Sequence, residues 1–222
     1  MTIAPDWKCA WSIYRDVAYP KDWDRQTLAL KPHTVGEIIK ACEVGETIPR
    51  LRASEHATRK VRRLFASGPV VTITERAIYI PERNTDPVAW GVLLNHVESA
   101  GFHIMKVRDT DAALNEGYGF AELNLDLRLA CYQEAKLNLL PVCGPASLCY
   151  FLPTPYLMFG AGVPADEWQG NMIDQGLPLG ASWPWATPEQ RIVYGKPSAE
   201  SMIAAFDAWY ANAAIKGERK LA

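Results

Sequence analysis

The sequence predicts an α/β protein with a mostly parallel sheet and helices on its faces. Apolar, β-rich runs recur along the chain, segments of helical periodicity separate them, and their spacing is that of strand–helix–strand units. Hydrophobic residues make up 49% of the 222 residues, enough to build a buried core. We expect an irregular and helical N-terminal extension over residues 1–67, followed by the α/β domain over residues 68–222.

Capping residues mark two helices in the extension. Thr34 and Ser54 are suited to begin them, and Gly45 and Gly68 to end them. The second helix carries a basic cluster, which is either a solvated helix face or a surface that meets phosphate. Its members are Arg59, Lys60, Arg62 and Arg63.

Strands and helices alternate in the domain. The strands are expected over residues 69–76, 102–109, 136–142 and 155–159. The helices are expected over residues 86–101, 121–135, 144–152 and 198–215, with a long loop over 160–197. Leucines alternate as in a strand within 121–135, but the length and composition of that segment favour a helix.

Composition narrows the class of protein. A net charge of −2 argues against a nucleic-acid partner held by bulk electrostatics. The cysteine count is odd and no CxxC pair occurs, which favours a reduced compartment without disulfides or a zinc site. The histidines show no metal-ligand spacing, and no run has the length of a signal peptide or a transmembrane span. We expect a soluble cytoplasmic protein without metal or cofactor, and the oligomeric state stays open.

Ligands of parallel α/β sheets bind beyond the carboxyl ends of the strands. That rule selects residues 75–84, 108–110 and 143–147, which we expect to converge on one edge of the sheet. In the last of these segments, a helix starting at Pro145 leaves unpaired N–H groups, Gly144 permits close backbone approach, and Ser147 adds a hydroxyl donor. The segment is therefore either an anion site or a plain strand–turn–helix junction.

Polar residues follow the first two strands. Arg76 comes directly after an apolar strand, and Glu82, Arg83 and Asn84 form a polar cluster in the same loop. An arginine fork can bind phosphate oxygens bidentately, although the loop could equally be solvated. Asp109, which precedes Thr110, either accepts hydrogen bonds from a ribose or base or caps the turn.

Three further features have two interpretations each. Arg128 either faces the same edge or lies on a solvated helix face. Trp183 and Trp185 either stack on a sugar or base or, more commonly, pack the long loop onto the core. Cys143 and Cys149 fit buried small residues better than nucleophiles.

These segments occur together and in a characteristic order. The runs "VTITERAIYIPERNT", "VRDT", "RLACYQEAKLNLLPVCGPASLC" and "PYLMFG" resemble the C-terminal, donor-binding half of GT-B glycosyltransferases, closest to the heptosyltransferase-like enzymes of bacterial surface carbohydrate. The resemblance covers about Gly68 to Gly160, and it implies a Rossmann-like fold. It also implies a nucleotide-sugar donor and a carbohydrate acceptor.

The resemblance assigns roles to individual residues. Gly144, Pro145 and Ala146 fall on the turn that contacts the donor diphosphate, and Arg76 falls where a basic residue meets the phosphates. Val142-Cys143 stand where the family has Asp-Ser/Thr, and Ser147 stands where it has His.

The remaining donor contacts are hypotheses from position alone. They are Ser147, Arg83, Asn84, Asp109, Thr110 and Arg128. Asp109 and Glu82 are candidates for the general base. Asp109-Thr110-Asp111 has the residue types of a metal-binding Asp-x-Asp pair but not a convincing position at a strand end. Two rivals to a glycosyltransferase stay open: a non-catalytic nucleotide- or sugar-phosphate-binding module, and an interaction protein with a tryptophan-rich N-terminus.

Overall fold

The computed structural model describes residues 34–48, 50–77, 84–110, 124–161, 173 and 176–215. By its contacts the chain divides into Met1–Val35, nearly all of it outside these ranges, and Gly36–Ala222. In the second unit, five parallel strands form one sheet in the order β3-β1-β5-β6-β7. These strands are β1 (Val70–Ile73), β3 (His103–Lys106), β5 (Leu137–Pro141), β6 (Tyr156–Ala161) and β7 (Gln190–Tyr194). The predicted parallel α/β fold is therefore confirmed.

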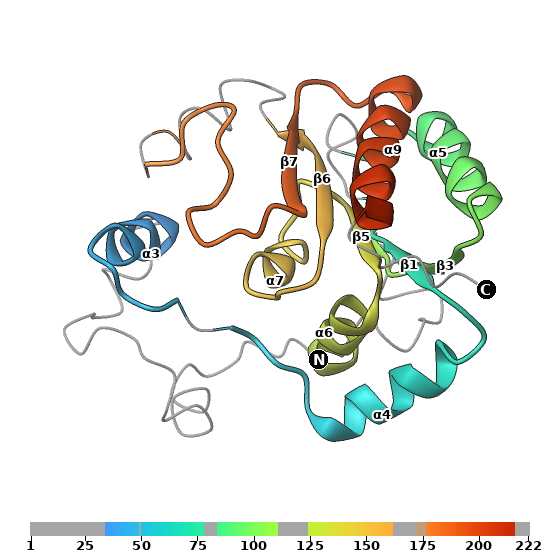
Figure 1. Ribbon diagram of the computed structural model, residues 1–222, viewed down its shortest axis with the longest axis horizontal. Coiled ribbons are helices and arrows are strands. Elements are labelled where there is room, and N and C mark those ends of the chain that lie inside the picture. The colour runs from blue at the N-terminus through green and yellow to red at the C-terminus, as the bar shows by residue number, and fades with distance from the viewer. Residues whose placement is uncertain are drawn as a thin grey trace, which may run out of the picture. The chain divides into compact units, whose positions relative to one another are not determined.

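Helices cover both faces of the sheet (Figure 1). The helices within the described residues are α3 (Thr34–Glu43), α4 (Glu55–Leu64), α5 (Pro87–Ser99), α6 (Leu125–Glu134), α7 (Ser147–Tyr150) and α9 (Ala199–Ile215). Helices α5 and α9 pack together on one face, and α6 and α7 lie on the other, with α4 packed against α6. This is a doubly wound sheet, and its strand order reverses between β1 and β5.

Side-chain capping fixes where three of the helices begin. Ser54 accepts a hydrogen bond from the N–H of Ala57 at the start of α4, as the sequence predicts. Asp86 accepts from the N–H groups at the start of α5, and Asn124 accepts from the N–H of Leu127 at the start of α6. Helix formation over 121–135 is thus confirmed, but only from Leu125 onward.

Strand β7 corrects the prediction of a loop over residues 160–197. The run Gln190–Tyr194 is short and lies among glycines, prolines and tryptophans, so its strand character depends on pairing with β6. A bulge at Gly160, which has a φ of 86°, shifts the register between these two strands. The tryptophans of the same region pack inward: Trp183 and Trp185 stack on each other and are 3% and 9% exposed.

Apolar side chains from alternate positions of the strands fill the core. Val71, Leu139 and Phe159 point toward α5 and α9, where they meet Trp90 and Phe206. The opposite face of the sheet is more polar at its centre, because it carries the buried Asn138 and Thr72.

Asn138 links β5 to its neighbours. Its Oδ1 accepts from the Thr72 hydroxyl of β1, and its Nδ2 donates to the carbonyls of Tyr132 in α6 and Pro155 before β6. Thr72 and Tyr132 are buried and Pro155 is partly buried, and an unpaired polar group in such a region of low dielectric is costly.

Replacing Asn138 with alanine should lower the free energy of unfolding by about 2–4 kcal/mol, because it leaves the Thr72 hydroxyl and two carbonyls without their partner. Urea unfolding of the variant measures the effect. Asn212→Ala, on an exposed face of α9, serves as the matched control and should change stability by less than about 0.5 kcal/mol. Equal stability of the two variants would contradict the assigned role of Asn138.

Candidate functional site at the strand-order switch

The predicted edge segments meet where the strand order reverses. Arg76 and Ala77 form the short strand β2 (Arg76–Ala77), which pairs in parallel with β4 (Asp109–Thr110) so that Arg76 lies opposite Asp109. Nη1 of Arg76 donates to the carbonyl of Val142, directly after β5, at 2.6 Å. The expectation that three distant segments converge on one edge is therefore confirmed.

Arg76 is held deep in this edge. Its side chain is 10% exposed, and its Nε lies 3.8 Å from Oδ2 of Asp109, whose side chain is 22% exposed. The carbonyl of Arg76 accepts from both the N–H and the hydroxyl of Thr85, which fixes the backbone at the far end of the loop. Within the described part of the chain, neither Nε nor Nη2 of Arg76 has a hydrogen-bond partner.

Arg128 is buried behind the same edge. It is 3% exposed, so the interpretation of a solvated helix face is wrong. Its Nη2 donates to the carbonyl of Arg108 at 2.7 Å, and its Nη1 donates to the hydroxyl of Tyr132. That hydroxyl shares a 2.7 Å hydrogen bond with Thr74, which follows β1. Arg128 thereby connects α6 to the ends of two strands.

We call Thr74, Arg76, Asp109, Arg128, Tyr132 and Cys143 the switch-point cluster. Burial raises the pKa of the Tyr132 hydroxyl well above its ordinary value. The pKa of the Cys143 thiol is raised to about 12, first by burial and then by the charge of Asp109, against the opposing effect of the two arginines. Cys143 therefore stays protonated at neutral pH, in line with the expectation that it is no nucleophile.

The turn after Cys143 is tighter than the sequence predicts. Helix α7 begins at Ser147, two residues later than Pro145, and spans only four residues. The Ser147 N–H and hydroxyl both donate to the carbonyl of Gly144, at 3.1 and 2.7 Å. Two donors that the sequence suggests for a ligand therefore stabilise the turn itself.

Gly144 borders open space. Its φ is not positive, and a Cβ placed on it would meet no atom within 4 Å. The backbone at this point is therefore accessible from outside, and no local strain demands a glycine.

The other predicted site residues fall into two groups. Asn84 and Thr110 lie on the described parts of the same two loops. Glu82 and Arg83 lie outside the described residues. No group of three or more metal-ligating side chains occurs within the described ranges. Nor is any helix in those ranges long and apolar enough to cross a bilayer.

Comparison with known proteins identifies a shared fold. No family model and no curated protein sequence matches the chain. The solved structure of ADP-heptose LPS heptosyltransferase II from E. coli is similar, with a TM-score of 0.53 and 12% identity over 75% of this chain and 54% of that one. A family 9 glycosyl transferase from Veillonella parvula gives a TM-score of 0.49, with 8% identity over 73% of this chain and 54% of that one.

The chain has a Rossmann-like fold shared with a GT-B glycosyltransferase. It spans about half the length of the two solved structures that it matches. The similarity to the heptosyltransferase structure thus agrees with the family resemblance seen in the sequence motifs, at the level of the fold.

The protonated state of Cys143 predicts a pattern of thiol reactivity. Iodoacetamide at pH 8 should modify Cys42, which is partly exposed, and leave the buried Cys143 and Cys149 unmodified in the folded protein. Peptide mapping by mass spectrometry reads out each site, and the urea-unfolded chain, in which all three should react, is the control. Modification of folded Cys143 as fast as Cys42 would show that the thiol is accessible and ionised.

Proposed function

We propose that the protein binds a nucleotide-diphospho-sugar at the strand-order switch and transfers its sugar to a carbohydrate acceptor. The convergence of Arg76, Asp109 and the turn at Gly144 on one edge of the sheet supports this proposal most directly. In doubly wound sheets this is the edge where phosphate-bearing ligands bind. The GT-B-like fold and the sequence resemblance point to the same class of ligand.

Arg76 is the principal group for the donor diphosphate. Its hydrogen bond to Val142 orients the guanidinium, and Nη2 has no acceptor among the described residues. A guanidinium fixed in this way stabilises the negative charge that builds up on a leaving diphosphate without having to reorganise. Gly144 lets phosphate oxygens approach the backbone of the turn, and Pro145 and Ser147 lie beside it at the surface, whereas the side chain of Ala146 is fully buried and cannot contact the ligand.

The remaining edge residues surround the nucleoside and the sugar. Asp109 accepts hydrogen bonds from donor hydroxyls, and Asn84, Thr110 and Arg83 are placed by sequence on the same loops. Arg128 positions Asp109 indirectly, because its hydrogen bond to the Arg108 carbonyl holds the strand end that carries Asp109.

The chemical step breaks the bond between the sugar's anomeric carbon and the diphosphate oxygen. The electron pair leaves with the nucleoside diphosphate, the acceptor's hydroxyl oxygen bonds to the anomeric carbon, and its proton passes to a general base. Asp109 and Glu82 are the candidate bases. The main rival is a non-catalytic module that binds the same donor, and an assay of sugar transfer with the best-binding donor separates the two.

Replacing Arg76 with glutamine should weaken the binding of a nucleoside diphosphate by about 10- to 100-fold, because a charged hydrogen bond contributes about 1.5–3 kcal/mol. Calorimetric titration with ADP and ADP-heptose measures the affinity, and the melting temperature without ligand reports whether the variant folds. Arg191→Gln, an exposed arginine on β7, is the control and should bind as the wild type does. An unchanged affinity in the Arg76 variant would remove Arg76 from the site.

Replacing Gly144 with alanine should leave stability within about 0.5 kcal/mol of wild type, because the added methyl group meets no protein atom. The same variant should bind ADP at least about fivefold more weakly, since the methyl occupies space reserved for the diphosphate. Gly91→Ala on α5 is the control: it also meets no atom, and it should leave binding unchanged. Full affinity in the Gly144 variant would place the ligand elsewhere.

A further inference from the structure

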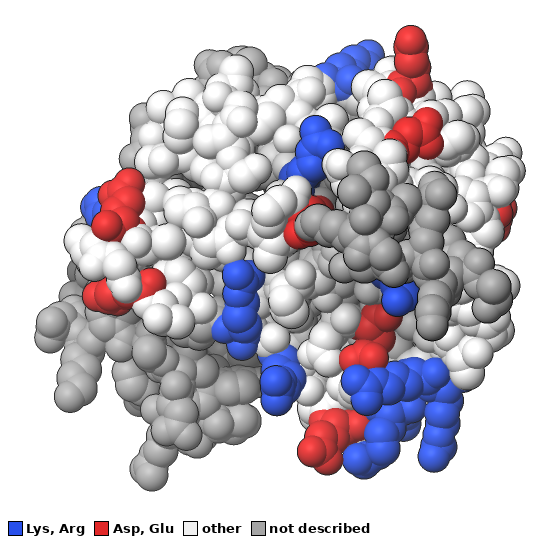
Figure 2. Space-filling view, viewed as in Figure 1, with Lys and Arg blue, Asp and Glu red and all other residues white. Residues whose placement is uncertain are grey.

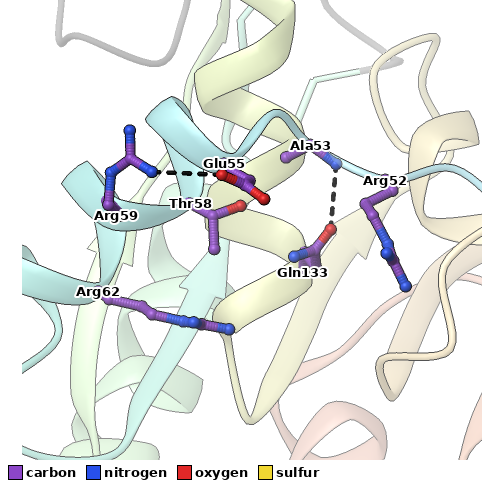
Figure 3. A pocket seen from close by; sticks show the side chains of 7 residues that line it. All are labelled: Arg52, Ala53, Glu55, Thr58, Arg59, Arg62 and Gln133. Atoms are coloured by element: carbon purple, nitrogen blue, oxygen red, sulfur yellow. Dashed lines mark hydrogen bonds and ion pairs between the residues drawn. The ribbon is translucent and has the colours of Figure 1, made fainter.

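A polar pocket lies between α4 and α6 and shares no residue with the switch-point cluster. Its volume is about 380 Å³, within the range of small-molecule sites. It is lined by Arg52, Ala53, Glu55, Thr58, Arg59, Arg62 and Gln133 (Figure 3).

The lining is strongly cationic. Three arginines face one glutamate, and Lys60 and Arg63 of α4 lie exposed beside them. Figure 2 shows Lys and Arg side chains gathered over the end of the molecule where Figure 1 places α4. Two of these cations, Arg59 and Arg62, are neutralised by ion pairs, whereas Arg52 has no hydrogen bond or ion pair within the described residues.

Neighbouring contacts prearrange the pocket. Arg62 donates two hydrogen bonds to Glu134, from Nε at 2.6 Å and from Nη2 at 3.2 Å, which fixes its guanidinium at the C-terminal end of α6. Burial opposes ionisation of Glu134, but hydrogen bonds from Arg62 and Gln133 outweigh it and lower its pKa.

Two contacts lie at the other end of the pocket. Gln133 accepts from the N–H of Ala53 at 3.1 Å, which holds the segment that bears Arg52 against α6. Arg59 pairs with Glu55 at 3.4 Å and so partly neutralises the one carboxylate of the lining. The hydroxyl of Thr58 points toward the same space (Figure 3).

We infer that this pocket binds the phosphate group of a phosphorylated molecule, with Arg52 as its principal contact. The donors that surround it are guanidinium, hydroxyl and amide N–H groups, and phosphate oxygens accept from all three. Because Glu55 pairs with Arg59 and Glu134 pairs with Arg62, the uncompensated positive charge of the lining is that of Arg52, which complements the negative charge of a phosphate. This inference does not depend on the proposed donor site.

Calorimetric titration with inorganic phosphate at constant ionic strength tests the site. The wild type should saturate in the millimolar range, and Arg52→Gln should weaken binding about tenfold or more. Arg63→Gln is the matched control, because it removes the same charge from α4 outside the pocket, and its affinity should stay within about twofold of wild type. Arg52 has no partner to lose, so its variant should keep the wild-type melting temperature.

Three outcomes would overturn the inference. They are the absence of saturable binding, equal weakening by Arg52→Gln and Arg63→Gln, and loss of phosphate binding in Arg76→Gln but not in Arg52→Gln. The second would indicate diffuse surface charge, and the third would place the phosphate at the strand-order switch. Failure of ADP binding alone would overturn the proposed function and leave this site intact.

Vesicles of phosphatidylglycerol, compared with phosphatidylcholine, identify the source of the phosphate. If the wild type and Arg63→Gln cosediment with the anionic vesicles and Arg52→Gln does not, the phosphate belongs to a lipid headgroup. If the protein does not cosediment but still binds inorganic phosphate through Arg52, the phosphate belongs to a soluble molecule. Either result supports a phosphate site.

Discussion

The hydrogen bond from Arg76 to the carbonyl of Val142 joins the two halves of the sheet where their strand order reverses. At this point the chain runs from β1 outward to β3 and from β5 outward to β6, in opposite directions across the sheet. The nearly buried side chain of Arg76 connects the segments that follow β1 and β5, and the pairing of Arg76 with Asp109 adds the segment that follows β3 to the same edge. The geometry of the candidate site therefore depends on this one guanidinium.

A second layer of buried polar groups supports that guanidinium. Arg128 connects the Arg108 carbonyl to Tyr132, and Tyr132 connects to Thr74. The bonds among Arg128, Tyr132 and Thr74 are buried, where a hydrogen bond is stronger and an unpaired partner costs more, and the bond to Arg108 is partly buried. Helix α6 thus does more than cover the sheet, because it fixes the strand ends from which the site residues project.

The sequence predicted those parts of the fold that depend on local chemistry. A capping residue such as Ser54 acts within a few residues, and convergence on one edge follows from parallel strand geometry. Strand β7 was missed because its pairing with β6 is non-local. The sequence left Arg128 either at this edge or on a solvated helix face, because an arginine in a helix is usually exposed, and only its tertiary partners reveal its burial.

The turn at Gly144 also changes the electrostatic argument for the site. Its Ser147 hydroxyl and N–H are committed to the Gly144 carbonyl, and Pro145 has no N–H to offer. A helix of four residues carries little of the dipole that makes a helix N-terminus attractive to anions. The turn is therefore a surface open to close approach at Gly144, and under the proposed function the charge of the diphosphate falls mainly to Arg76.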